Sequence, residues 1–151
     1  MHSNNLIRSI LLSLFLVATV NGYSQKDKGF NFPKDFGKTE TVVVLGPHAV
    51  SSKKVSESII KAFEKEYSGK IEMLADRYGK NTSDSQGVKV YVLTVLEMPS
   101  AVRGTYDYKF GLIESATGTQ YLCDFWSGSY KKGAQYYAKH LEQFRKANGG
   151  K

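Results

Sequence analysis

The chain has few of the cysteines and prolines that stabilise some classes of small protein. Among its 151 residues there is one cysteine and there are three prolines. A single cysteine excludes a framework of intrachain disulfide bonds, and so few prolines exclude a collagen-like helix. Hydrophobic residues make up 41% of the chain and charged residues 23%, close to the usage of globular proteins. The composition therefore predicts one folded domain and not a wholly disordered chain.

The N-terminus, residues 1–24, has the three parts of a secretory signal peptide. Arg8 supplies the basic first part, an apolar run covers residues 10–20, and small and polar residues follow at 21–24. The apolar run is short for a membrane span, which needs about 20 such residues. We therefore interpret this segment as an export signal, with an uncleaved N-terminal anchor as the alternative.

Cleavage is expected after Ser24, which makes Gln25 the first residue, and cleavage after Gly22 is the alternative. No cysteine stands near this site to carry a lipid, so we expect a periplasmic or secreted protein without a lipid anchor. Removal of the signal leaves a net charge near +6. That surplus favours weak attraction to polyanions such as anionic lipid, acidic glycan or nucleic acid, without specifying one of them.

Residue patterns divide the rest of the chain into an arm and one domain. Residues 25–38 carry three scattered phenylalanines and read as a linker or a docked arm, and residues 39–148 read as a single α+β domain. Alternating or β-branched apolar runs predict strands, and single apolar stripes between glycine or serine signals predict helices. The expected strands cover 39–45, 88–98, 105–115 and 120–126, and the expected helices cover 52–69 and 129–148.

The segment 71–75 is ambiguous, because its alternation suits a strand while its residue types also suit a helix. We interpret it as a strand. The predicted architecture is a two-layer sandwich of order β-α-β-β-β-α, with two helices on one face of a mostly antiparallel sheet.

The second half of the domain resembles a group of small envelope proteins of Gram-negative bacteria. Leu112, Ile113 and Glu114 precede the Thr-Gly pair at 117–118, and an aromatic-Ser-Gly run follows at 126–128. This pattern and the element order resemble the penicillin-binding-protein activator lipoproteins and the curli-secretion lipoprotein. The chain departs from them in lacking the lipid-attachment cysteine and in carrying glutamate at 114, where aspartate is more usual. The resemblance implies a binding or adaptor role in the envelope and carries over no catalytic residue.

Metal and thiol chemistry have weak support in the sequence. His48 and His140 lie in different predicted elements, and neither has a cysteine or an acid at ligand spacing. The lone thiol, Cys123, falls on the strand face that we predict is buried, where a free cysteine behaves as a small apolar residue. We therefore expect no metal site and no cofactor.

Acid–base chemistry is the remaining catalytic possibility. Asp107 and Asp124 face outward on neighbouring predicted strands, and Glu114 lies near the turn between them. Two carboxyl groups held about 5–9 Å apart are the arrangement that glycoside hydrolysis uses. Acids on exposed strands more commonly discourage edge pairing. We expect no catalytic residues, and a small extracytoplasmic hydrolase stays as an alternative.

Basic side chains recur on the last predicted helix. Lys132, Lys139 and Lys146 are seven residues apart, and Tyr136 lies close to them. Lysines beside an aromatic ring suit a polyanionic strand or sugar, while a solvated helix face gives the same pattern. The stripe therefore predicts a polyanion-binding module as a second alternative, although no specific nucleic acid is expected.

Apolar side chains occupy both faces of the predicted strand 88–98. If the helices cover one sheet face, we expect Tyr91, Leu93 and Val95 on the other, partly exposed, where such a patch marks a partner site. Trp126 is a further candidate for an aromatic surface, against the alternative that the aromatic residues are core pairs. The sequence thus predicts an exported, non-catalytic envelope protein that binds a protein or glycan, with no transmembrane segment after signal removal.

Overall fold

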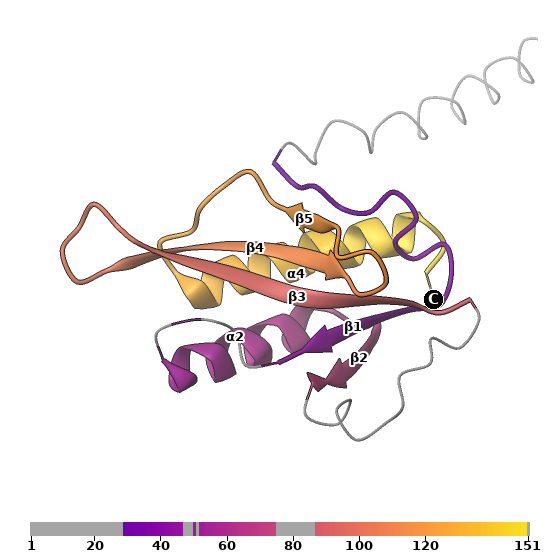
Figure 1. Ribbon diagram of the computed structural model, residues 1–151, viewed down its shortest axis with the longest axis horizontal. Coiled ribbons are helices and arrows are strands. Elements are labelled where there is room, and N and C mark those ends of the chain that lie inside the picture. The colour runs from indigo at the N-terminus through magenta and orange to yellow at the C-terminus, as the bar shows by residue number, and fades with distance from the viewer. Residues whose placement is uncertain (1–28, 47–49, 51, 75–86, 151) are drawn as a thin grey trace, which may run out of the picture.

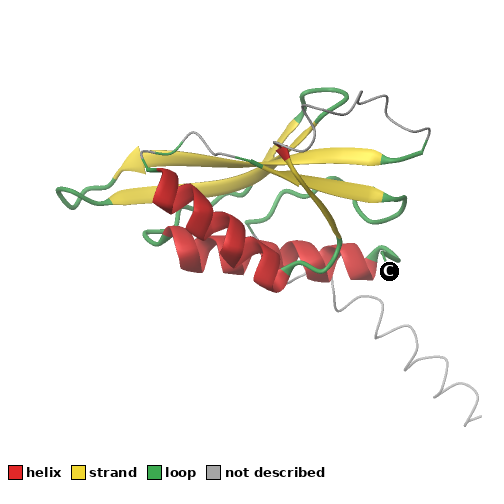
Figure 2. Ribbon diagram, turned by 90° about the horizontal axis from the view of Figure 1, so that it is seen from below, coloured by secondary structure: helices red, strands yellow, loops and turns green. Residues whose placement is uncertain are grey.

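Five strands form one open sheet, and two helices cover one of its faces in the computed structural model (Figures 1 and 2). The structure describes residues 29–46, 50, 52–74 and 87–150. The predicted signal peptide with its cleavage site, and His48, lie outside the described residues. The strands are β1 (Thr41–Leu45), β2 (Lys70–Met73), β3 (Lys89–Pro99), β4 (Tyr106–Glu114) and β5 (Gln120–Leu122), and the helices are α2 (Lys53–Glu66) and α4 (Tyr130–Ala147).

The sheet has the strand order β2-β1-β3-β4-β5. β1 pairs in parallel with β2 and β3, whereas β3, β4 and β5 pair antiparallel. Most of the paired residues are antiparallel, since β3 and β4 match along almost their whole lengths. The predicted α+β class is confirmed. The ambiguous segment, interpreted as a strand, lies mostly in β2, so the predicted order β-α-β-β-β-α counted one strand too few.

The core lies between the sheet and the two helices. Every residue of β1 is buried, because Val43 and Leu45 pack in the core beneath the helices and Val42 and Val44 pack with Val90 in a second cluster. The helices contribute the apolar stripes that their periodicity predicts: Ile59 and Phe63 from α2, and Tyr137 and Leu141 from α4, are all fully buried.

The described part of the expected arm, residues 29–38, packs on the domain. Phe36 is fully buried, with its ring centroid 5.3 Å from that of Tyr91, and Phe32 packs edge-on against Tyr137. The side-chain amide of Asn148 donates a hydrogen bond of 2.9 Å to the carbonyl oxygen of Phe36. The arm therefore closes the core over the end of α4.

None of the helices in the described part of the chain is both long enough and apolar enough to cross a bilayer.

Candidate functional site

A pocket forms where the chain leaves β5 and enters α4. After β5 the backbone runs beside β4, with two hydrogen bonds of 2.8 Å between Tyr108 and Ser127. Ser129 then caps α4, its side chain accepting a hydrogen bond from the backbone of Lys132. The next turn of the helix presses on β4, because a Cβ at Gly133 would lie 2.6 Å from the ring of Phe110. Trp126, which comes just before the chain enters α4, remains exposed to solvent.

The pocket has a volume of about 360 Å³ and lies between residues 125–127 and the first two turns of α4. That volume is within the range of roughly 300–1,000 Å³ typical of small-molecule sites. Its lining is mainly apolar, with one lysine and one serine: the residues are Phe125, Trp126, Ser127, Lys132, Gly133 and Tyr136. Three residues that the sequence predicted as binding residues therefore meet in one place.

Two of the lining rings are open to solvent. The exposed fraction is 40% for Trp126 and 50% for Tyr136, large for aromatic side chains. Tyr136 is supported from behind by an edge-on contact with Phe125, at 5.7 Å between ring centroids, and by His140 at 4.3 Å. The pocket thus presents aromatic rings that are held by their neighbours and still have free surface.

Positive charge surrounds these rings. The ammonium of Lys109, on β4, lies 5.6 Å from the centroid of the Trp126 ring, within the range of a cation–π contact. Lys132 is exposed on the pocket rim, and its ammonium supplies three hydrogen-bond donors. The chemistry that this arrangement offers is stacking together with donation to an anionic or hydroxyl-rich ligand.

The predicted lysine stripe divides between two ends of α4. Lys132 lies at the pocket, and Lys139 is exposed midway along the helix. Lys146 lies near the other end and forms an ion pair of 3.1 Å with Glu142. Only the first of the three lysines is therefore part of the pocket.

The expectation for the open face of the sheet was wrong in its choice of residues. Tyr91, Leu93 and Val95 are buried beneath the helices, with exposed fractions of 0%, 2% and 3%. The alternate residues of β3 face away from the helices, and two of them, Leu96 and Met98, are more than two-fifths exposed.

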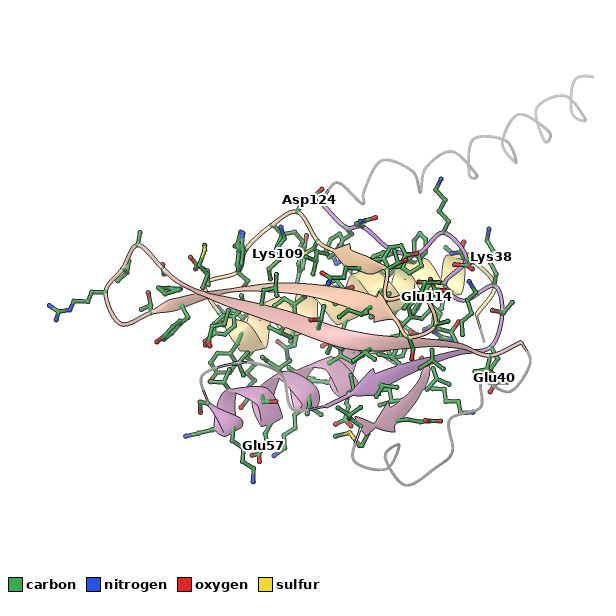
Figure 3. The ribbon with its side chains drawn as sticks, in the orientation of Figure 1. Lys38, Glu40, Glu57, Lys109, Glu114 and Asp124 are labelled. Atoms are coloured by element: carbon green, nitrogen blue, oxygen red, sulfur yellow. The ribbon has the colours of Figure 1, made fainter. Side chains whose placement is uncertain are left out.

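Three residues of the hydrolase alternative, Cys123, Glu114 and Asp107, have different surroundings. Cys123 is fully buried and donates a hydrogen bond to the carbonyl oxygen of Phe125. Glu114 accepts hydrogen bonds from Lys89 and Thr117 at the far end of β4, and Figure 3 shows it well separated from Asp124. Asp107 lies on β4 opposite Met98. Within the described residues, no three histidine, cysteine or acidic side chains group as metal ligands.

Sequence reasoning missed a buried ionic cluster at the end of α4. Arg145 is 5% exposed and forms two hydrogen bonds of 2.9 Å with Glu142. The hydroxyl of Ser68 donates a further bond of 2.6 Å to the same carboxylate. Burial raises the pKa of Glu142, but the bonds from Arg145, Ser68 and Lys146 outweigh burial and lower it to about 2.

No protein-family model matches the chain, and no curated protein matches it. Solved structures of PelC dodecamers from Paraburkholderia phytofirmans share a distant likeness. One, of a PelC variant, has 11% identity and a TM-score of 0.39, and covers 76% of this chain and 93% of its own. Another has 12% identity and a TM-score of 0.35, and covers 78% of this chain and 92% of its own. Neither likeness assigns a function.

Proposed function

We propose that the protein is an exported, non-catalytic module of the cell envelope that binds a glycan in the pocket between Trp126 and Tyr136. The observation that carries this proposal is the meeting of two exposed rings and the Lys132 ammonium in one cavity. The envelope role is the one that the resemblance to the activator and curli-secretion lipoproteins implies.

A sugar ring matches this combination of groups. One face of a pyranose is lined by C–H bonds and lies favourably on an aromatic ring, while its hydroxyls stay directed to polar groups. The pocket offers aromatic surface on Trp126 and Tyr136 and a donor on Lys132. Binding sites of this size characteristically pair an apolar lining with a few placed polar groups.

The charge at the pocket favours a glycan with carboxylate groups. Lys132 on the rim and Lys109 against Trp126 are both cationic, and none of the described side chains that line the cavity is acidic. A hydrogen bond from an ammonium to a carboxylate is roughly twice as strong as one between neutral groups. We therefore expect uronic-acid oligosaccharides to bind more tightly than neutral oligosaccharides of the same length.

The test is calorimetric titration of the processed protein with oligogalacturonate and with neutral gluco-oligosaccharides. Trp126→Ala and Tyr136→Ala should each weaken binding of both classes about tenfold, since a stacked ring contributes roughly 1–3 kcal/mol. Lys132→Gln should weaken binding of the acidic class alone.

Two variants serve as matched controls. Tyr106→Ala removes a ring that is 39% exposed but lies outside the pocket, and Lys139→Gln removes a lysine from α4 away from the pocket. Both should bind like the wild-type protein. Absence of binding to either sugar class, or equal losses in the controls, would contradict the glycan assignment.

Export is tested by a separate experiment. The intact mass of protein recovered outside the cytoplasm should correspond to a chain that starts at Gln25, or at Tyr23 for cleavage after Gly22. Recovery of the full-length chain from the cytoplasm alone would contradict export and leave the sugar titration unaffected.

A further inference from the structure

One end of the molecule is a two-stranded ribbon that extends beyond the rest of the sheet. β1 is paired with β3 only as far as Val92, and β5 is paired with β4 only from Gly111. Nearer the turn, β3 and β4 pair with each other, and the single bridge from Tyr108 to Ser127 is the only other strand pairing within the described residues. Figure 1 shows this hairpin projecting past both helices.

The hairpin carries apolar side chains on both faces and at its tip. Met98 is 45% exposed on the face away from the helices, and Tyr106 is 39% exposed on the opposite face. Val102, in the turn, is 65% exposed. A surface that docks flat against a partner needs apolar residues on one face only. Apolar residues on every side of a projecting tip are instead suited to insertion into an apolar layer.

The tip has one charged residue, and it is basic. Between Met98 and Asp107 the only charge is that of Arg103. Acidic side chains stand at the base of the hairpin: Asp107 lies opposite Met98, and Glu97 accepts a hydrogen bond from Tyr108. These acids set the depth to which the hairpin can enter an apolar layer.

Basic residues lie near the base of the hairpin, on the helix side of the sheet. Both helices begin at this end of the molecule, and each has two lysines and no acid in its first turn. Cations at a helix N-terminus oppose the helix dipole, so helix stability does not explain them. The lysines are Lys53 and Lys54 in α2, and Lys131 and Lys132 in α4.

Acids pair with several of the basic residues at the opposite end. Lys70 pairs with Glu40 at 3.0 Å, and Lys89 pairs with Asp35 and Glu114. Figure 3 shows Glu40 and Glu114 at that end, away from the hairpin. At the hairpin end, the one ion pair given by the described residues is Lys53 with Glu57, at 3.9 Å and highly exposed. At the hairpin end, the five basic residues Arg103, Lys53, Lys54, Lys131 and Lys132 outnumber the three acids Glu57, Glu97 and Asp107.

We propose that this end docks on an anionic lipid bilayer, with Val102 entering the headgroup boundary and Arg103 and the helix lysines contacting lipid phosphates. Apolar side chains at a basic surface provide the two terms that hold proteins at a membrane interface, namely burial of apolar area and attraction to anionic lipid. Arg103 and the lysines at the helix starts are complementary in charge to an anionic surface. The apolar side chains at the tip favour a surface with an apolar layer beneath it, as a bilayer has.

The test is sedimentation of the processed protein with vesicles of phosphatidylglycerol mixed with phosphatidylcholine, and with vesicles of phosphatidylcholine alone. Binding is expected on the anionic vesicles only. Val102→Asp and Arg103→Glu lie in an exposed turn, so neither threatens folding. Each should weaken binding about tenfold or more.

The matched control is Lys38→Glu, which changes the charge by the same amount as Arg103→Glu but at the far end of the molecule (Figure 3). It should change vesicle binding by less than about threefold, since that end lies beyond a Debye length of about 8 Å from the bilayer. A loss equal to that of Arg103→Glu would show attraction through net charge and overturn the proposal. So would absence of binding to the anionic vesicles.

Insertion is measured with a polarity-sensitive dye on Val102→Cys, since the native Cys123 is buried and protected from labelling. The emission should shift to shorter wavelength on anionic vesicles, whereas the same dye on Lys38→Cys should not shift. Vesicle binding without a shift at position 102, as expected for an electrostatic contact that leaves the tip in water, would overturn the insertion. None of these variants alters the Trp126–Tyr136 pocket, so failure here leaves the glycan assignment standing.

Discussion

Arg145→Met tests whether the buried ionic cluster stabilises the fold. Arg145 holds Glu142 with two parallel hydrogen bonds of 2.9 Å, and the two residues are 5% and 7% exposed. Ser68, which lies between α2 and β2, donates to the same carboxylate. The substitution removes the guanidinium and leaves a methionine of similar length, so the loss is one of charge and hydrogen bonds.

The expected cost is about 3 kcal/mol in the free energy of unfolding at neutral pH. Removal of one member of a buried pair costs roughly 3–5 kcal/mol, because the other charge stays buried without compensation. Lys146 still reaches Glu142, which argues for the lower end of that range. Against the effect of burial, which raises it, the bonds from Arg145, Ser68 and Lys146 also lower the pKa of the Glu142 carboxyl from 4.5 to about 2, a direction that agrees with a pair that stabilises the fold.

The cost depends on pH in a direction fixed by that pKa. The carboxyl of Glu142 has a pKa below its ordinary value in the folded chain, so it stabilises the fold above pH 4.5. That stability is lost as the pH falls from 4.5 towards 2. The difference between wild-type protein and Arg145→Met should therefore be largest near neutral pH and shrink through the acid range.

The assay is urea unfolding followed by far-ultraviolet circular dichroism across this pH range, with two further variants. Lys146→Met removes only an exposed partner and should cost less than about 1 kcal/mol. The double variant Glu142→Leu with Arg145→Met should recover most of the loss, since two apolar side chains replace the pair. A cost below about 1 kcal/mol for Arg145→Met, or a cost that does not vary with pH, would refute the reasoning.

Two further predictions concern packing, and both are measured by the same unfolding assay. Gly111→Ala should cost about 2 kcal/mol, because its Cβ would lie 2.6 Å from both the Leu122 side chain and the carbonyl oxygen of Tyr121. Gly128→Ala, whose Cβ meets only one atom at 3.5 Å, should change stability by less than about 0.5 kcal/mol, and equal effects would contradict the packing argument. Phe36→Ala should cost about 3–5 kcal/mol if the arm completes the core, whereas a loss below about 1 kcal/mol would show that the arm is a loose linker.

Most element boundaries could be predicted from the sequence, although the strand predicted over 120–126 ends at Leu122. The choice between the two faces of β3 could not be predicted. Both sets of alternate residues in β3 are apolar, so periodicity alone does not say which set meets the helices. The register with β4 decides it. Leu96 lies opposite Lys109 and Met98 opposite Asp107, whereas Val95 lies opposite the buried Phe110. Knowing the length of the turn in advance would have placed Leu96 and Met98 on the open face.

Three of the residues that line the pocket were binding candidates from the sequence, but the pocket itself was not predicted. Lys132 and Tyr136 share a helix face and were recognisable together, whereas Trp126 joins them through the bridge between Tyr108 and Ser127, which is a tertiary feature. The ionic cluster of Glu142, Arg145 and Ser68 was not predicted, for a similar reason. Glu142 and Arg145 have the spacing of an ordinary surface pair on a helix, and their burial depends on Ser68, more than 70 residues away along the chain.

The two ends of the domain differ in a way that stability alone does not explain. At the end where α4 terminates, basic side chains such as Lys70 and Arg145 are paired with acids, and the arm is anchored through Phe36. At the hairpin end, rings, apolar side chains and lysines remain exposed, and the lysines oppose the helix dipoles. Local arrangements that cost stability persist where they serve binding, because selection removes only losses that fall below the threshold for function. Replacing Lys54 with glutamine, which leaves the Lys53–Glu57 pair in place, should therefore stabilise α2 slightly while weakening attachment to anionic surfaces.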